Sequence, residues 1–251
     1  MKVLVVCPTY GRLHYLGRVL AGFLSQTHPD KELVFINDNK DVTIKCDYSN
    51  VHCINLSKRI LLPDKRNLGV SLGSYDIYMP HDDDDIFLPD RISNRVKIHS
   101  SEGVTSTVDE TGYVVYHNKF DKVKCIPSTF CSYTREAFFQ VGGYQHHQNS
   151  GEDQEFYNKL CSDPKHQRLK LIHDAIYNYS GVNYHATYAE QKDVDEIAYN
   201  QLVAMDLLGK EFTIVPDYTE YIKFLDLARR NNLTNEPIEV SFDNGGKVLY
   251  E

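Results

Sequence analysis

The sequence predicts an α/β fold with a mainly parallel central sheet and helices on both faces. Short, continuous apolar runs, as at 3–7 and 33–36, alternate with longer segments in which apolar residues recur at helical spacing. Continuous apolar runs are typical of strands that are buried on both faces. Polar, turn-forming residues follow these runs, and the resulting order of strand, loop and helix is that of a doubly wound sheet.

The first hundred residues supply most of the expected sheet. Leu16, Leu20 and Phe23 recur at helical spacing and define one apolar face. Gly73 ends a second, short helix, and Pro89 suits the first turn of a third, where proline is favoured. The expected strands are 3–7, 33–36, 51–56 and 77–79, and the expected helices are 15–26, 66–72 and 88–100.

Shorter elements are expected in the second half. Thr134 is placed to cap a helix that Gly142 and Gly143 end. Strands are expected at 104–108 and 113–116 around a turn at 110–112, helices at 134–141, 152–161, 193–208 and 218–230, and an interrupted strand-like segment at 238–249. We therefore expect one body, residues 1–190, followed by a C-terminal helical appendage, residues 191–251.

Composition narrows the class of protein. The chain has 251 residues, of which 41% are hydrophobic and 25% charged, so it can bury a core and is not disordered. Its net charge of -8, without a Lys/Arg-rich run, lacks the basic patch typical of nucleic-acid binders. None of the 6 cysteines forms a C-x-x-C pair, so free thiols are expected rather than a zinc site. No signal peptide or membrane-span-length apolar stretch is visible, so a cytoplasmic protein is expected.

An acidic cluster, Asp82 to Asp85, directly follows the expected strand 77–79. Adjacent carboxylates repel one another and are costly to bury unpaired. They are tolerated in a solvated loop that caps a helix, or around a divalent cation. Open α/β sheets bind ligands beyond the carboxyl ends of their strands, and the polar loops 8–12 and 37–39 belong to the same edge. The arrangement predicts a metal-assisted site.

Seven short motifs, in order, resemble those of family 2 glycosyltransferases with the GT-A fold. The resemblance covers about residues 3–185 and does not extend beyond about residue 190. The segments that carry it are 5–12, 25–29, 35–39, 65–70, 82–91, 135–144 and 151–153.

This resemblance implies a Rossmann-like, nucleotide-binding GT-A fold and a hexosyl- or pentosyltransferase. Residues 1–100 would bind the nucleotide sugar, and 101–190 would hold the acceptor and the catalytic groups. The implied reaction is inverting transfer from a UDP-, GDP- or dTDP-sugar to an acceptor hydroxyl, with a UDP-sugar as the donor expected first. A divalent metal, Mn²⁺ or Mg²⁺, is implied as the cofactor.

The resemblance also assigns metal ligands. Asp84 would bind the metal that bridges the diphosphate. Asp82 would contact the ribose or the metal, with Asp83 and Asp85 nearby. His185 stands where this family often has a late histidine close to the diphosphate, and it is carried over as a further metal or phosphate ligand.

The remaining assignments concern the nucleotide and the acceptor. Asp153 would be the general base, with Glu152 beside it. Asp38 would face the nucleobase. The other expected nucleotide contacts are Pro8, Thr9, Tyr10 and Arg12 in the first loop and Lys65 and Arg66 in the second helix. Arg59, in the short basic pair with Lys58, is expected in solvent.

Two other functions stay open at this point. A nucleotidyltransferase could use a similar sheet, although its usual glycine-rich, basic loop is poorly matched by residues 8–12. A non-catalytic module could bind metal together with a carbohydrate or a nucleotide, although the cluster lacks the ligand spacing of an EF-hand. The acceptor is equally open between a glycan and another hydroxyl-bearing molecule. Small transferases of this kind in phages can act on modified DNA bases, in which case the host cytoplasm is expected.

Overall fold

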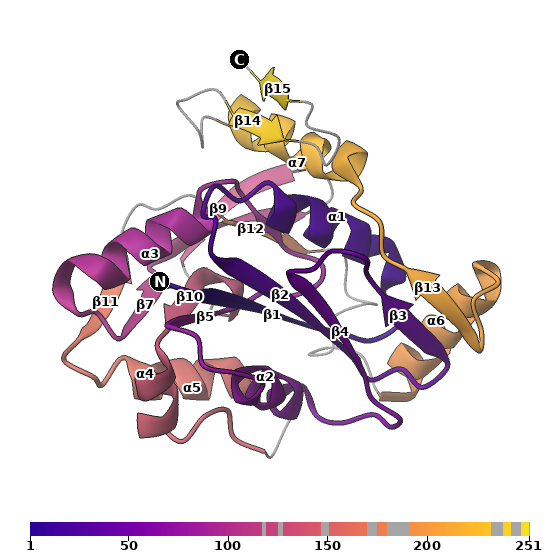
Figure 1. Ribbon diagram of the computed structural model, residues 1–251, viewed down its shortest axis with the longest axis horizontal. Helices are drawn as coiled ribbons and strands as arrows, with labels where there is room; N and C mark the ends of the chain where they lie inside the picture. The colour runs from indigo at the N-terminus through magenta and orange to yellow at the C-terminus, as the bar shows by residue number, and fades with distance from the viewer. Residues whose placement is uncertain are drawn as a thin grey trace.

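The computed structural model describes residues 1–116, 119–124, 128–146, 151–169, 175–179, 191–231, 238–241 and 247–250. A seven-stranded sheet forms its centre (Figure 1). Its strands, in spatial order, are β11 (His166–Leu169), β7 (Ser106–Asp109), β10 (Cys131–Tyr133), β5 (Ile77–Pro80), β1 (Val3–Thr9), β2 (Lys31–Asn37) and β4 (Val51–Asn55). All neighbours are parallel except β10, which runs antiparallel to β5 and β7. The predicted, mainly parallel sheet is confirmed.

Both faces of this sheet are covered. Successive residues of β1 point to opposite sides, and each set packs in a different core cluster. Val3, Val5 and Cys7 pack with α1 (Leu13–Leu24) and Ile92 of α3 (Arg91–Glu102). Leu4 and Val6 belong to the other face, which is covered by α2 (Leu62–Ser71), α4 (Arg135–Gln140) and α5 (Glu152–Leu160). Figure 1 shows α1 and the α2–α4–α5 group on opposite sides of the sheet. The described cysteines, Cys7 among them, are free thiols as expected.

Three helix boundaries differ from the prediction by three residues or more. The helix α3 begins at Arg91, because Pro89 and Asp90 form a turn in which the Arg91 N–H donates to the Leu88 carbonyl. The carbonyls of Leu88 and Pro89 also accept hydrogen bonds from Gln26 and Thr27. The helix α2 begins at Leu62, and its Pro63 lies in the first turn. The helix α6 (Gln191–Ala204) ends at Ala204 rather than at the predicted residue 208, and Asp206, which follows it, has a positive φ.

The strands expected on either side of residues 110–112 both form, but they belong to different sheets. The strand β7 is hydrogen-bonded to β10 on one side and β11 on the other, so neither edge is open to the next strand. That strand, β8 (Thr111–Tyr116), instead joins a second sheet of order β6-β12-β8-β9. Its other members are β6 (Ile86–Phe87), β12 (Ala175–Tyr179) and β9 (Lys119–Lys124).

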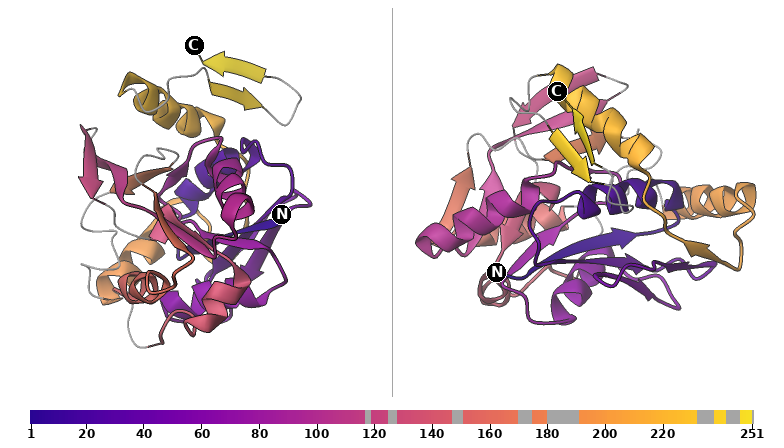
Figure 2. Two further views of the ribbon diagram at one scale, coloured as in Figure 1. Left: turned by 90° about the vertical axis from the view of Figure 1, so that its left-hand side faces the viewer. Right: turned by 45° about the horizontal axis from the view of Figure 1, so that its top comes forward.

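The C-terminal segment packs onto the main body. The strand β13 (Lys210–Thr213) pairs in parallel with β3 (Val42–Lys45), a strand that the sequence did not predict. Leu202 of α6 lies in the same core cluster as α1, and Tyr221 of α7 (Tyr218–Arg230) is fully buried. A hairpin of β14 (Ile238–Ser241) and β15 (Lys247–Tyr250) lies beyond α7 (Figure 2). Within the described part of the chain, no helix has both the length and the hydropathy of a membrane span.

Candidate active site

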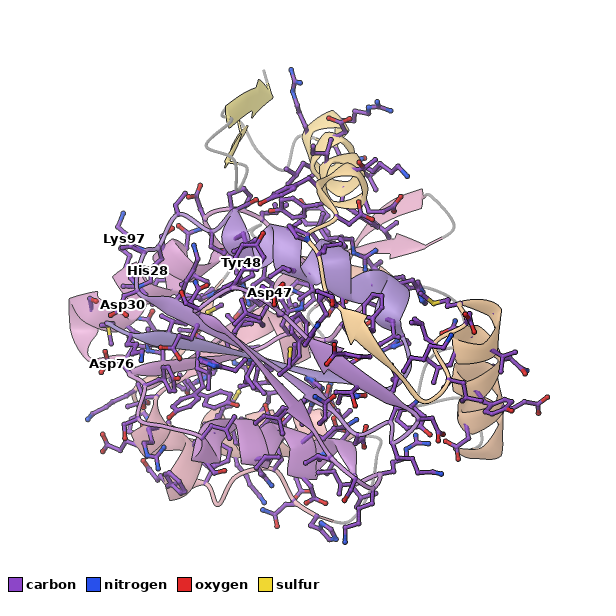
Figure 3. All side chains as sticks on the ribbon, turned by 45° about the vertical axis from the view of Figure 1, so that its right-hand side comes forward. His28, Asp30, Asp47, Tyr48, Asp76 and Lys97 are labelled. Atoms are coloured by element: carbon purple, nitrogen blue, oxygen red, sulfur yellow. The ribbon has the colours of Figure 1, made fainter. Side chains whose placement is uncertain are left out.

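The predicted polar loops meet at the carboxyl end of the central sheet. Asp30 and Asp76, labelled in Figure 3, come directly before β2 and β5 and mark the amino end. Thr9 and Asn37 end β1 and β2 in register with one another at the opposite end. The acidic cluster follows β5, the parallel neighbour of β1. The topology therefore brings the three loops to one edge, as ligand sites in open α/β sheets require.

Two carboxylates of the acidic cluster converge on one cation, the guanidinium of Arg12. Asp84 Oδ2 lies 2.7 Å from Arg12 Nη1, and Asp83 Oδ1 is ion-paired with Arg12 Nη2. Thr9 Oγ1 also donates a hydrogen bond of 2.7 Å to Asp83 Oδ2. Burial raises the pKa of Asp83 to about 6, although Arg12 opposes the shift. The backbone of the loop is held separately, because Arg18 Nη2 donates to the Asp84 carbonyl at 2.7 Å.

Arg66 joins the acidic cluster to the start of α5. Its Nη2 lies 2.9 Å from Asp82 Oδ1, and its Nη1 lies 2.7 Å from Glu152 Oε1. Burial lowers the pKa of the guanidinium, but Asp82, Glu152 and, more weakly, Asp153 raise it well above its ordinary value. Burial likewise raises the pKa of Glu152 against the opposing effect of Arg66. The predicted metal loop and the predicted catalytic loop are thus connected by one buried arginine.

Asp153 has a different environment from Glu152. Gly151, with φ of 78°, precedes both and turns the chain into α5. Glu152 is buried and occupied by Arg66, whereas Asp153 is half-buried. A half-buried carboxylate beside Arg66 has the access to an incoming molecule that Glu152 lacks.

Asp38 and Lys65 form a buried pair beside the first loop. Lys65 Nζ lies 2.8 Å from Asp38 Oδ1 and 3.4 Å from the Thr9 carbonyl. The other carboxylate oxygen of Asp38 accepts a hydrogen bond of 3.0 Å from the Ile60 N–H. Burial lowers the pKa of Lys65, and Asp38 opposes this shift. Of the other first-loop residues, Pro8 lies within β1, in register with Ile36 of β2.

The fourth aspartate of the cluster, Asp85, anchors the loop to Thr129. Thr129 Oγ1 donates to Asp85 Oδ2 and accepts from the Asp82 N–H at 3.3 Å. The Thr129 carbonyl accepts from Arg91 at 2.6 Å, and Arg91 is paired with Asp109 at 2.8 Å. Sequence reasoning missed this support, because Thr129 and Asp109 lie far along the chain and match no motif.

Sequence reasoning also missed a group that packs against the ring of Tyr10. The Arg59 guanidinium lies 3.9 Å from the centre of the Tyr10 ring and forms an ion pair with Asp195 of α6. The expectation that Arg59 lies in solvent is therefore wrong. Its acidic partner is 136 positions away in the sequence, so no local pattern identifies it.

Comparison with known proteins now identifies the family. The model of glycosyl transferase family 2 matches residues 4–183. This chain belongs to that family. The glycosyltransferase is 27% identical over 202 residues to an uncharacterized glycosyltransferase of Bacillus subtilis, YwdF, covering 72% of this chain and 75% of that protein.

Solved structures agree on the fold of this glycosyltransferase. The S. aureus TarS 1–349 complex with UDP-GlcNAc has a TM-score of 0.61 at 14% identity, covering 94% of this chain and 74% of that one. Longer TarS gives a TM-score of 0.57 at 15% identity, over 80% of this chain and only 43% of its own. The mannosyltransferase PcManGT of Pyrobaculum calidifontis gives a TM-score of 0.51 at 13% identity, over 92% and 70%. The GT-A fold is confirmed.

A metal ion fits part of this donor set. Among the residues that the structure describes, no three His, Cys, Asp or Glu side chains group around one ion position; His185 lies outside those residues. Asp83 and Asp84 nevertheless both form ion pairs with the guanidinium of Arg12, so their carboxylates already face one shared position. Mg²⁺ and Mn²⁺ need only one or two carboxylates when phosphate and water complete the shell.

Proposed function

We propose that this glycosyltransferase moves a sugar from a nucleoside diphosphate sugar to an acceptor hydroxyl with inversion, using Mn²⁺ or Mg²⁺. The observation that carries the proposal is the convergence of Asp83 and Asp84 on one cation position at the ligand-binding edge of the sheet. Support also comes from structures of the same fold, which hold UDP-GlcNAc or UDP in TarS, and GDP-Man with Mn²⁺ in PcManGT.

Asp84, with Asp83 or Asp82, would hold the metal, whose charge neutralises the diphosphate as the glycosidic bond breaks. Arg12, released from these carboxylates, would be free to turn toward the phosphate oxygens. Asp38 and Lys65 lie beside Thr9 and would contact the nucleoside. Arg66 would keep the acidic cluster at a set distance from α5.

The half-buried Asp153 would accept the proton of the acceptor hydroxyl as that oxygen attacks the anomeric carbon from the face opposite the diphosphate. Glu152, buried and paired with Arg66, would position this loop rather than act as the base. A UDP-sugar is the first donor to test, and a GDP-sugar the second. The acceptor class stays open between glycans and other hydroxyl-bearing molecules, a modified DNA base included.

A thermal-shift screen of UDP-, GDP- and dTDP-sugars, with and without Mn²⁺, tests the donor. A ligand that binds only the folded state raises the melting temperature by mass action. We expect one nucleotide class to stabilise the protein, and the shift to grow when Mn²⁺ is present. Absence of any nucleotide shift would overturn the proposal, and pyrophosphate release from a nucleoside triphosphate and a sugar phosphate would favour a nucleotidyltransferase.

Asp153→Asn tests the general base. The amide cannot take up a proton, so we expect transfer to fall by ~10²–10⁴-fold while the dissociation constant for the donor changes little. Release of nucleoside diphosphate in the presence of acceptor measures the first quantity, and calorimetry the second. Transfer within a few-fold of wild type removes Asp153 from this role.

A further inference from the structure

The helix α6 lies directly against the first loop, although it is outside the segment that the family model matches. Gly11 has a φ of 71°, and a Cβ placed on it would lie only 2.6 Å from the Cβ of Ala198. The same Cβ would lie 3.2 Å from Asn39 Nδ2, in the loop after β2. Gly11 is therefore the point at which α6 and the loops after β1 and β2 meet. Figure 3 shows α6 at the end of the molecule opposite to Asp30 and Asp76.

One turn before Ala198, Asp195 reaches across to this loop. It pairs with Arg59, whose guanidinium lies 3.9 Å from the centre of the Tyr10 ring. Burial and Asp195 raise the pKa of the Tyr10 phenol, and Arg59 opposes them. Tyr10 is half-buried, and the Arg59 side chain keeps 29% of its surface in solvent. The stacked pair is thus ordered by α6 and still open to a ligand.

This stacked pair adjoins the residues proposed to contact the nucleoside. Ile60, the neighbour of Arg59, donates its N–H to Asp38, and Asp38 is paired with Lys65. Arg12, two residues after Tyr10, faces the acidic cluster instead. The loop therefore presents its Tyr10 side to Asp38 and Lys65 and its Arg12 side to the proposed diphosphate position.

We infer that α6 forms one wall of the nucleoside pocket, and that Asp195 is a positioning residue that holds Arg59 against Tyr10 as a stacking platform for the nucleobase. This inference rests on the proposed function. Guanidinium planes and aromatic rings both stack on nucleobases with little dependence on which base is present. A mobile arginine side chain loses conformational entropy when a base stacks on it. Because the ion pair with Asp195 on α6 already restricts Arg59, nucleotide binding costs less of this entropy.

Asp195→Asn tests this role through the dissociation constants of UDP and GDP, measured by calorimetry with Mn²⁺, beside that of inorganic pyrophosphate with Mn²⁺. Because the Arg59–Asp195 pair is partly exposed, we expect a moderate effect. The dissociation constant of the nucleoside diphosphate should rise about three- to tenfold, while that of pyrophosphate stays within about twofold. Asp195→Glu should restore most of the nucleotide affinity.

Two further variants isolate the stack. Glu196→Gln removes the same charge from the adjacent, exposed position of α6 and should leave nucleotide binding at the wild-type level. Arg59→Lys keeps the charge but removes the planar guanidinium, so it should weaken nucleoside diphosphate binding as Asp195→Asn does. Melting temperatures of the free proteins show whether each variant is folded.

The outcomes separate this inference from the proposed function. Wild-type protein that binds neither nucleotide overturns the proposed function and this inference with it. Wild-type binding with an unchanged nucleotide affinity in Asp195→Asn and Arg59→Lys overturns the inference alone. An equal loss of nucleotide and pyrophosphate affinity also overturns it, since that pattern indicates general loosening of the loop rather than loss of a platform for the base.

Discussion

At the scale of single residues, the site is organised by arginines that hold acidic groups in place. Arg12 lies between Asp83 and Asp84, and Arg66 lies between Asp82 and Glu152. Buried carboxylates are tolerated only when they are paired, so each aspartate of the cluster needs a partner in the protein without ligand. The arginine at the first loop therefore occupies the place that the proposed metal would take.

Arg12→Gln should bind Mn²⁺ more tightly than wild type when no nucleotide is present. Without the guanidinium, Mn²⁺ no longer competes with an internal positive charge for Asp83 and Asp84. We therefore expect the affinity for Mn²⁺ to rise about tenfold. Electron paramagnetic resonance of free Mn²⁺ measures the affinity. Lys58→Gln, which removes a positive charge outside this cluster, is the matched control. Unchanged or weaker Mn²⁺ binding would falsify the view that Arg12 occupies the metal position.

A second residue-scale prediction concerns His99, which is buried between α3 and the sheet. Its Nδ1 lies 2.7 Å from the Val104 carbonyl, which can only accept, so Nδ1 carries the proton and Nε2 accepts from Ser132 Oγ at 2.8 Å. Burial lowers the pKa of His99 to about 4, with Arg95 adding to the shift and the Val104 hydrogen bond opposing it.

This depressed pKa makes stability depend on pH in a defined direction. Above about pH 6.5 neither state binds the proton, and between about pH 6.5 and 4 only the unfolded state does, so stability falls as the pH is lowered. We expect the stability advantage of wild type over His99→Gln to shrink by about 2 kcal/mol between pH 7.5 and 5. Urea unfolding at the two pH values measures it, and parallel pH curves for the two proteins would contradict the argument.

At the scale of elements, glycines set how closely the C-terminal segment approaches α1. A Cβ on Gly17 would lie 2.8 Å from the Val215 carbonyl, and one on Gly22 would lie 3.0 Å from the Tyr221 ring. Glycine inside a helix costs about 1 kcal/mol relative to alanine. That cost is offset here by packing. Because Gly17 has no side chain, the backbone at Val215, just before α7, can lie directly against α1.

Gly17→Ala should therefore destabilise the protein, although the same change usually stabilises an exposed helix. The new methyl would meet a backbone oxygen that cannot rotate away, and we expect a loss of about 1–2 kcal/mol in the free energy of unfolding. Denaturant titration measures this loss. Asn200→Ala, at an exposed position of α6, controls for helix propensity and should be neutral or slightly stabilising. A more stable Gly17→Ala protein would show that the contact with residue 215 is dispensable.

At the scale of the whole molecule, the C-terminal segment and the main body share buried surface. Tyr221 is fully buried, and its hydroxyl donates to the Phe87 carbonyl at 2.9 Å. Leu225 and Ala228 of α7 pack in one cluster with Ile86 and Ile176 of the second sheet. Unfolding of α7 would expose this cluster, so we expect the two parts to unfold together.

Tyr221→Ala should lower the free energy of unfolding by about 3–5 kcal/mol, as large-to-small changes in a core do. The loss should appear in a single transition, and Tyr221→Phe, which keeps the ring, should lose only about 1 kcal/mol. Urea unfolding followed by circular dichroism provides both values. A separate early transition, with the main transition at its wild-type midpoint, would indicate an independent C-terminal unit.

Local pattern was sufficient for those parts of the molecule in which one segment decides its own structure. The apolar runs of β1 and β2, the apolar face of α1 and the cap of α4 at Thr134 depend on residues within one element, and the structure confirms them. The acidic cluster after β5 was also visible, because parallel strands place their following loops at one edge.

Tertiary structure alone decided the partners. The sequence could not show that β7 has both edges occupied, that β3 pairs with β13, or that Arg59 meets Asp195. Each of these depends on contacts between residues distant in the chain, which carry no periodicity and no local propensity. The sequence by itself therefore determined the order of elements, the family motifs and the edge at which the site forms. Packing decided which charges pair there. A buried carboxylate is costly unless it is paired, and the cation that pairs with it is the one that the fold brings close in space, whatever its distance in sequence.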